Sequence, residues 1–321
     1  MLTGDELASL QTMIYRHMRP TPCYAWPLLA DALGCEVWVK HENHTPTGAF
    51  KVRGGLVYLH ELSKQADKRD IVTATRGNHG QSIPFAARQY GRAVHVWVPQ
   101  GNSPEKNAAM QAWGATLHVQ GADFDEAREA AEAAAVEMDA LQIPSFHEHL
   151  VRGVATYSTE MFADAGELDT VYVPIGLGSG AASVIWVRDL MGLHTEVVGV
   201  VSQHADAMAL SFEAGRVVQG NSSNTFADGV ATRVPNPQAF DILQRGLARV
   251  VRVSEDEIAG AMRLLYRTTH NVSEGAGAVA TAALTQERDS QRGKRVAVVL
   301  TGGNVDADVF AQVLNGDTPR I

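Results

Sequence analysis

A lysine that follows a tight turn is the strongest chemical candidate in this sequence. The stretch KHENHTPTGAFKVRGG spans residues 40–55 and places Lys51 directly after Phe50. Residues 37–40 are predicted to form a short strand, 46–48 a turn, and the residues after the turn the start of a helix. A lysine held beside an aromatic ring loses hydration, and its amine can then act as a nucleophile that forms Schiff bases. Because a single lysine at a helix start is more often an ordinary solvated side chain, this assignment needs support from other segments.

A second segment, TRGNHGQS at residues 75–82, comes directly after a predicted strand and before a predicted helix over residues 83–90. Such a turn places backbone N–H groups and a helix N-terminus at the carboxyl edge of a sheet, where an anion is favoured. Taken alone, Gly-Asn-His-Gly is more often an ordinary turn. Its position relative to the lysine segment favours a functional role.

A glycine-rich segment, PIGLGSGAAS at residues 174–183, also lies between a predicted strand and a predicted helix, the latter over residues 182–191. Its three alternate glycines permit close backbone approach, and successive N–H groups can surround a phosphate. A dinucleotide-binding fold is an alternative. However, the spacing is G-x-G-x-G rather than G-x-G-x-x-G, which is weak evidence by itself.

Two further segments contain polar residues at positions of interest. The sequence TGGN begins with Thr301 and follows the predicted strand at residues 296–300. Thr301 is either a helix N-cap or a hydroxyl that faces a ligand. Glu274, in SEGAGA, is either a surface residue before a glycine-rich turn or a carboxylate near the same site.

In this order, the four segments resemble the signatures of the serine/threonine dehydratase family. These are pyridoxal phosphate (PLP) enzymes of the tryptophan-synthase-β fold type, fold type II. The lysine segment matches the family pattern ExxxPTGxFKxRG, and the resemblance extends over nearly the whole chain. It implies that Lys51 carries PLP as a Schiff base and acts as the catalytic group. The other cofactor-binding residues that it implies are Phe50, Asn78 at the 3′-hydroxyl, Gly176, Leu177, Gly178, Ser179 and Gly180 at the phosphate, Glu274, and Thr301 at the pyridine nitrogen. For the substrate carboxylate it implies Thr75, Arg76, Gly77, Asn78 and His79.

The order of secondary structure predicts an α/β protein built on open, mainly parallel twisted sheets with helices on both faces. The resemblance divides the chain into a large PLP-binding domain of residues 1–53 and 147–321 and a small inserted αβ domain of residues 54–146. PLP would lie in the cleft between them. The pattern alone also allows one continuous sheet. Strands are predicted at 36–39, 70–74, 93–98, 116–119, 170–173, 196–201 and 296–300, and the longest helix at 122–141.

Several positions depart from the family pattern. Leu177 and Ser179 interrupt what is usually a run of four glycines, and Ala49 and Arg76 replace serines. Two carboxylates that form a cation site in several relatives are matched here by Val201 and Ala207, so we expect no metal site. The chain also ends soon after TGGN, and we expect no regulatory domain of the kind found in feedback-controlled threonine dehydratases.

Composition limits the partners and the compartment. The chain has 321 residues and a formal net charge of −9, which argues against nucleic acid as a partner. Its two cysteines, Cys23 and Cys35, form no disulfide framework and are typical of a reducing compartment. The sequence shows no signal-peptide pattern and no apolar stretch long enough to span a membrane. We therefore expect a cytoplasmic protein, and the resemblance implies a homodimer.

The expected function is that of a PLP-dependent dehydratase, an ammonia-lyase. It would eliminate water from a β-hydroxy amino acid (threonine, serine, or a bulkier one such as phenylserine or 3-hydroxyaspartate) and yield a 2-oxo acid and ammonia. An amino-acid racemase or a β-replacement enzyme would share the same motifs, although Arg76 stands where a racemase would have its serine acid. A non-catalytic nucleotide-binding module is an alternative from another class. A yellow absorbance band in the purified protein distinguishes that module from the PLP enzymes.

Overall fold

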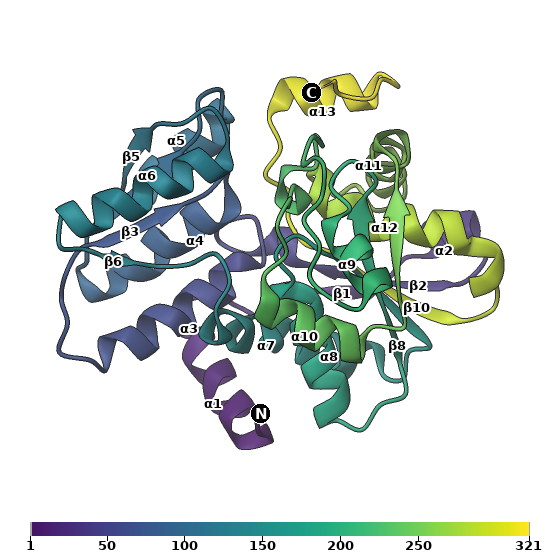
Figure 1. Ribbon diagram of the computed structural model, residues 1–321. Helices are drawn as coiled ribbons and strands as arrows, with labels where there is room; N and C mark the ends of the chain where they lie inside the picture. Colours follow the sequence, from purple (N-terminus) through teal and green to yellow (C-terminus); the bar gives the residue numbers. More distant parts are fainter. Residues whose placement is uncertain (1, 321) are drawn as a thin grey trace.

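The computed structural model describes residues 2–320 and contains two separate sheets, each covered by helices (Figure 1). The larger sheet has the strand order β1-β2-β10-β7-β8-β9. Its strands are β1 (Cys23–Ala25), β2 (Glu36–His41), β7 (Thr170–Pro174), β8 (Glu196–Ser202), β9 (Arg249–Val253) and β10 (Arg295–Leu300). The smaller sheet has the order β5-β4-β3-β6, with β3 (Ile71–Ala74), β4 (Val94–Val98), β5 (Ala115–Val119) and β6 (Leu141–Gln142).

Thirteen α-helices lie within the described residues, and none of them is long and apolar enough to cross a membrane. They are α1 (Gly4–Ile14), α2 (Pro27–Leu33), α3 (Lys51–Ser63), α4 (Asn78–Ala87), α5 (Pro104–Ala112), α6 (Phe124–Glu137), α7 (Glu148–Ala165), α8 (Ser179–Leu190), α9 (Ala207–Ala214), α10 (Pro237–Gly246), α11 (Glu255–Thr269), α12 (Gly275–Glu287) and α13 (Ala307–Leu314). Short 3-10 turns occur at η1 (Glu42–His44), η2 (Arg88–Tyr90), η3 (Asp228–Val230) and η4 (Arg288–Gln291).

The larger sheet is parallel except for β1, which pairs with β2 in the antiparallel direction. Its central strands are buried on both faces, as is usual for parallel sheets covered by crossover helices. Val171 and Val173 of β7 point into a core formed with α7, α8 and α10, whereas Tyr172 points into a second core with α2, α11 and α12. Two hydrophobic layers therefore hold the carboxyl ends of these strands in place.

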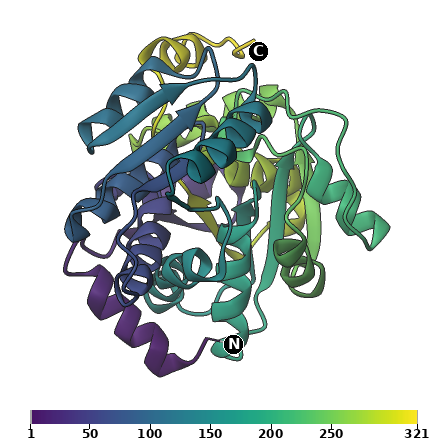
Figure 2. The same cartoon turned by 60° about the vertical axis from the view of Figure 1, so that its left-hand side comes forward.

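All four strands of the smaller sheet run parallel. Ile71 and Val96 face a core formed with α3, α4 and α5. Val72 and Trp97 face the alanine-rich side of α6. Figure 2 shows the yellow C-terminal helix α13 at the same end of the molecule as the blue small sheet, and the backbone N–H of Ala307 there donates to Glu105 Oε1 of α5 at 3.0 Å.

The predicted α/β class and mainly parallel sheets are confirmed, but several boundaries were wrong. The helix predicted at 122–141 ends at Glu137, because Asp139 adopts a left-handed φ of 48° and the chain enters β6 two residues later. Helix α7, with 18 residues, is longer than α6, with 14. Strands β1, β6 and β9 were not predicted. The proposed domain borders stay a prediction, and the one between residues 53 and 54 falls inside α3.

Helix α3, which begins at Lys51, is fixed by close approach to two neighbouring helices. At Gly54 an added Cβ would lie 2.8 Å from the carbonyl oxygen of Leu150, and at Gly153 of α7 it would lie 2.2 Å from that of Arg53. On the α4 side, a Cβ at Gly55 would meet Ser82 Oγ at 2.3 Å. Only glycine permits this backbone contact. These contacts fix the position of the start of α3 against α7 and α4.

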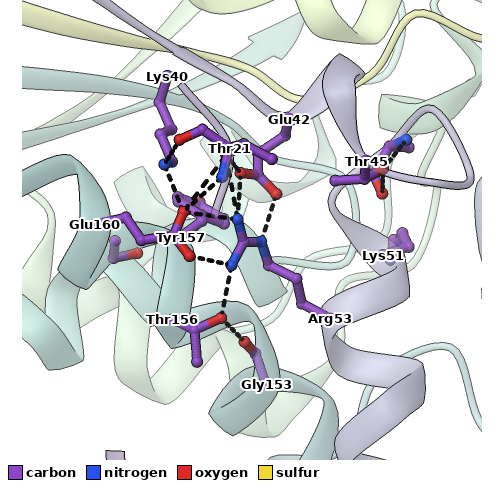
Figure 3. Close-up of polar contacts among 12 residues, drawn as sticks. Thr21, Lys40, Glu42, Thr45, Lys51, Arg53, Gly153, Thr156, Tyr157 and Glu160 are labelled. Carbon is purple, nitrogen blue, oxygen red and sulfur yellow. Dashed lines mark hydrogen bonds and ion pairs between the residues drawn. The ribbon is translucent and has the colours of Figure 1, made fainter. Parts of the chain in front are cut away.

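A buried ion cluster lies directly behind this helix start (Figure 3). Arg53 Nε donates to Glu42 Oε2 at 2.7 Å, and Arg53 Nη1 donates to Glu160 Oε1 at 2.6 Å. Lys40 Nζ donates to Glu160 Oε2 at 2.6 Å. Lys40, Glu42 and Arg53 have no exposed surface. Two cations and two carboxylates balance in charge, and Thr21 and Thr156 satisfy further donors of the guanidinium.

We expect the Arg53→Met variant to lower the free energy of unfolding by about 3–5 kcal/mol, because it leaves two buried carboxylates with Lys40 alone. Urea unfolding monitored by circular dichroism measures this loss. The matched control is Arg152→Met, which removes a more exposed pair with Glu148 and should change stability by about 0–1 kcal/mol. Equal losses in the two variants would contradict the assigned role of the cluster.

Candidate active site

The turn before Lys51 is paired with the TGGN segment. Gly48 closes the turn with a φ of 68°, and its N–H donates to the carbonyl of Thr45 at 3.0 Å. The N–H of Phe50 donates to the carbonyl of Thr301 at 3.0 Å, and Ala49 forms a bridge with Gly302. Two segments that are 250 residues apart in the chain are therefore joined by backbone hydrogen bonds, with Lys51 next to the junction.

Lys51 is half-buried, and its Nζ lies 5.5 Å from the ring centroid of Phe50. Within residues 2–320 the amine makes no hydrogen bond and no ion pair, and burial lowers the pKa of Lys51 to about 8. Figure 3 shows Lys51 at the start of α3, outside the ion cluster that holds Arg53. The amine is thus easier to deprotonate than that of an ordinary lysine.

A single pocket is lined by all of the predicted site residues. These are Phe50, Lys51, Thr75, Arg76, Gly77, Asn78, His79, Gly176, Leu177, Gly178, Ser179, Gly180, Glu274 and Thr301. They follow the carboxyl ends of four strands, β2, β3, β7 and β10, or begin α12. The fold therefore brings the predicted residues together, while the role of each residue stays a proposal.

The glycine-rich loop is more helical than predicted. Helix α8 begins at Ser179 rather than at residue 182, and Gly178 precedes it with a φ of 100°. Opposite the loop, the carbonyl of Gly229 is so close that a Cβ at Gly176 would lie 2.4 Å from it. Tyr157 Oη donates to the carbonyl of Gly180 at 3.1 Å. The free N–H groups at the start of α8 are suited to an anion such as a phosphate.

The RGNHGQ loop also enters its helix earlier than predicted, since α4 begins at Asn78 rather than at residue 83. His79 is buried, and both burial and the nearby charge of Lys51 lower its pKa to about 3, so its ring is neutral. The Nε2 atom of His79 is buried without a partner in the part of the chain that the structure describes. That atom is available to a ligand group in the pocket.

Asn78 and Glu274 lie in a hydrogen-bond network across the pocket. Asn78 Nδ2 donates to Glu274 Oε1 at 2.6 Å, and Asn78 Oδ1 accepts from Asn304 Nδ2 at 2.8 Å. On the other side of Glu274, Lys106 Nζ lies 3.4 Å from Oε2 and 2.5 Å from Asp228 Oδ2. Lys106, Asp228 and Asn304 were not predicted. The signal for Asn304 was its place in TGGN, whereas Lys106 and Asp228 stand in segments that carried no chemical pattern.

Arg76 differs from Lys106 and Arg233, two cations of the pocket that form ion pairs. Lys106 is paired with Asp228, and Arg233 with Asp125 at 3.1 Å. The half-buried side chain of Arg76 makes no ion pair or hydrogen bond to any residue from 2 to 320. Its charge is therefore not neutralised by a protein carboxylate in direct contact.

The two positions at which we predicted that a metal site is lost are Val201, near the end of β8, and Ala207, at the start of α9. Both side chains are buried and apolar. The neighbouring Asp206 is occupied by Arg252, whose Nε donates to it at 2.8 Å. No group of three or more His, Cys, Asp or Glu suited to a metal lies among residues 2–320. The absence of a functional cation stays a prediction.

The residues present fit PLP. An amine without a partner, Lys51, lies in the same pocket as the glycine-rich start of α8, which is suited to a phosphate. Thr301 and Asn78 provide neutral polar groups that suit a ring nitrogen and a ring hydroxyl. The pocket therefore contains a group for each polar part of the cofactor.

Comparison with known proteins supports this fit. Residues 14–302 match the family model described as "Pyridoxal-phosphate dependent enzyme". The chain is 31% identical over 316 residues to an L-threonine ammonia-lyase of Thermotoga maritima, which covers 98% of this chain and 79% of the relative. Among solved structures, a threonine deaminase isoform of Solanum lycopersicum superposes with a TM-score of 0.88 at 28% identity, covering 98% and 94% of the two chains. A serine racemase of Dictyostelium discoideum superposes with a TM-score of 0.85 at 26% identity, covering 95% and 99%. This chain therefore belongs to the serine/threonine dehydratase family of fold type II and is a PLP-dependent ammonia-lyase.

Proposed function

We propose that this protein eliminates water from a β-hydroxy amino acid, threonine or a bulkier analogue, and releases a 2-oxo acid and ammonia. The observation that carries the proposal is the amine of Lys51, which has no partner among residues 2–320 and shares its pocket with the loops at 75–79 and 176–180. The threonine ammonia-lyase relative supports threonine as one candidate substrate.

In this proposal, Lys51 would hold PLP covalently and the start of α8 would hold its phosphate. Asn78 and Thr301 would bind the ring hydroxyl and the ring nitrogen, and Phe50 would pack beside the lysine stem. Bound PLP withdraws electrons from the Cα of an attached amino acid and so acidifies the Cα–H bond. The neutral hydroxyl of Thr301 leaves the ring nitrogen less strongly protonated than a carboxylate would, which suits elimination over long-lived carbanions.

Lys51 would then transfer protons, and the small sheet would limit the access of water. The amine of Lys51 would take the proton from Cα and pass it to the Cβ hydroxyl, which would leave as water. Hydrolysis of the resulting enamine consumes one water and gives the 2-oxo acid and ammonia, so that water balances over the reaction. The small sheet covers the pocket from one side through residues 75–79 and 123–125, which limits access of water.

Racemisation is a second candidate, favoured by the likeness to the serine racemase of Dictyostelium discoideum. A racemase needs an acid on the face of Cα opposite Lys51. The position that resembles the family's serine acid is Arg76, whose guanidinium does not release its proton near neutral pH. Elimination is therefore the preferred proposal. The non-catalytic nucleotide-binding module is disfavoured by the family assignment.

The proposal includes a homodimer in the cytoplasm. The homodimer rests on the family resemblance. The compartment rests on Cys23 and Cys35, which are both buried and unbonded.

We expect the Lys51→Ala variant to lose both the visible absorbance of bound PLP and all release of ammonia from L-threonine, because no amine remains to hold the cofactor or accept the Cα proton. Absorbance spectra and an ammonia assay measure the two effects, and circular dichroism shows whether the variant is folded. The control is Lys64→Ala at the exposed end of the same helix, which should retain both properties. Normal ammonia release by Lys51→Ala would contradict the proposal.

The surroundings of Arg76 suggest which type of side chain the substrate carries. Its guanidinium lines the pocket without a protein partner, so it is free to contact the substrate. A planar, permanently charged donor can bind a second carboxylate or stack on an aromatic ring. These properties favour 3-hydroxyaspartate or phenylserine over threonine and serine.

We expect the Arg76→Ser variant to raise kcat/KM for threonine relative to 3-hydroxyaspartate and phenylserine by about tenfold or more, which corresponds to about 1.4 kcal/mol. Steady-state kinetics with the four amino acids measure the ratio. The control is Arg233→Ser, which removes a cation of the same pocket that is already paired with Asp125 and should leave the ratio unchanged. If the ratio is the same in Arg76→Ser and the unmodified enzyme, Arg76 does not select the substrate.

A further inference from the structure

Lys106 belongs to α5, which packs beside the small sheet. Its side chain reaches across the pocket to two carboxylates on the side of the large sheet. Its side chain is 8% exposed, and its Nζ lies 2.5 Å from Asp228 Oδ2 and 3.4 Å from Glu274 Oε2. The stem passes over the RGNHGQ loop, since a Cβ at Gly77 would lie 2.7 Å from Lys106 Cδ. Both carboxylates belong to segments outside the small sheet. The contact therefore exists only while α5 lies against the rest of the molecule.

The contact with Lys106 favours the charged form of Glu274. Its side chain is 3% exposed, and burial together with the carboxylate of Asp228 raises its pKa, whereas Lys106 lowers it. Among residues 2–320, Lys106 is the cation that forms an ion pair with Glu274. A buried carboxylate beside a second carboxylate takes up a proton unless a cation is close. Loss of Lys106 therefore favours the neutral form of Glu274.

The charge of Glu274 is transmitted to the proposed cofactor contacts. Glu274 Oε1 accepts from Asn78 Nδ2 at 2.6 Å, and this bond is stronger when the carboxylate is ionised. Asn78 accepts in turn from Asn304 Nδ2 at 2.8 Å, and the same nitrogen donates to the carbonyl of Thr47 at 2.8 Å. The chain of hydrogen bonds ends at Thr47, in the turn that precedes Lys51. The orientation of Asn78 is thus linked to α5 through one carboxylate.

We propose that Lys106 is a positioning residue that favours the charged form of Glu274 while α5 is docked, so that closure of the small sheet and the orientation of Asn78 are coupled. The inference rests on the proposed site, but not on the choice of substrate. Two hydrogen bonds outside the pocket also hold α5 in its docked position. Ser103 Oγ, at the start of α5, bonds to Asp306, and Glu105 accepts from the N–H of Ala307 at 3.0 Å.

The variants Lys106→Met and Asp228→Asn test the coupling because they act on Glu274 with opposite signs. The measurement is the pH at which the visible band of bound PLP changes in the holoenzyme, with Glu274→Gln to identify the step that belongs to Glu274. We expect Lys106→Met to move this step to higher pH by one unit or more, because the cation that lowers the pKa of Glu274 is gone. Asp228→Asn should move it to lower pH, because a neighbouring negative charge is gone.

Lys106→Arg should restore the position of the step, and Lys64→Met, which removes an exposed cation far from the pocket, should not move it. The other charged or titratable groups that line the pocket are retained in every variant; they are Lys51, Arg76, His79, Asp123, Asp125 and Arg233. Hydrogen exchange of the α5 amides provides a readout that does not depend on the cofactor, and it should be at least tenfold faster in Lys106→Met.

Shifts of the same sign in Lys106→Met and Asp228→Asn, a step that persists in Glu274→Gln, or unchanged exchange of α5 would each overturn the proposal. If Lys106→Met does not fold, the direction of the shift in Asp228→Asn decides the question. A protein without a visible band before any substitution would instead contradict the proposed function. The exchange of α5 would still be informative in that case.

Discussion

The proposed chemistry depends on a lysine amine that is shielded from water and yet has no carboxylate beside it. Lys40, Arg53 and Lys106 lie close to Lys51 in sequence or in space, and each of them is paired with buried or half-buried carboxylates. A carboxylate next to Lys51 would keep its amine protonated and therefore inactive as a nucleophile or base. The structure pairs these three cations with carboxylates and leaves the Lys51 amine beside the ring of Phe50.

The rest of the architecture keeps that amine in position. The loops that line the pocket follow parallel strands of two different sheets, and helix termini at α4 and α8 point their N–H groups into the same space. Backbone contact at Gly54 and Gly153 fixes α3, and the ion cluster around Arg53 anchors its first turn from behind. The site is therefore built on rigid elements. Helix α5, by contrast, is held across the pocket by a small number of polar contacts. This difference fits a small sheet that moves during catalysis.

Much of this arrangement could be predicted from the sequence because the chemistry lies in short local patterns. Glycines, a turn and a lysine at fixed spacing predicted the loops, and alternating strands and helices predicted mainly parallel sheets. The cleft between two parts of the chain was implied by the resemblance to the dehydratase family. Two kinds of feature were missed. Strands β1, β6 and β9 were not recognised, since β1 has three residues, β6 has two, and β9 alternates valine with arginine at the sheet edge. Lys106 and Asp228 were missed because their pairing depends on contact between distant segments, which no local pattern records.

The central claim is that Lys51, rather than another lysine, holds the cofactor. Reduction of the holoenzyme with sodium borohydride, followed by proteolysis and mass spectrometry, fixes PLP to the lysine that carries it. The account predicts a phosphopyridoxyl group on the peptide that contains Lys51, and an unlabelled Lys106, because the amine of Lys106 is held by Asp228 and Glu274. A label on Lys106, on Lys40 or on a surface lysine with Lys51 unmodified would contradict it.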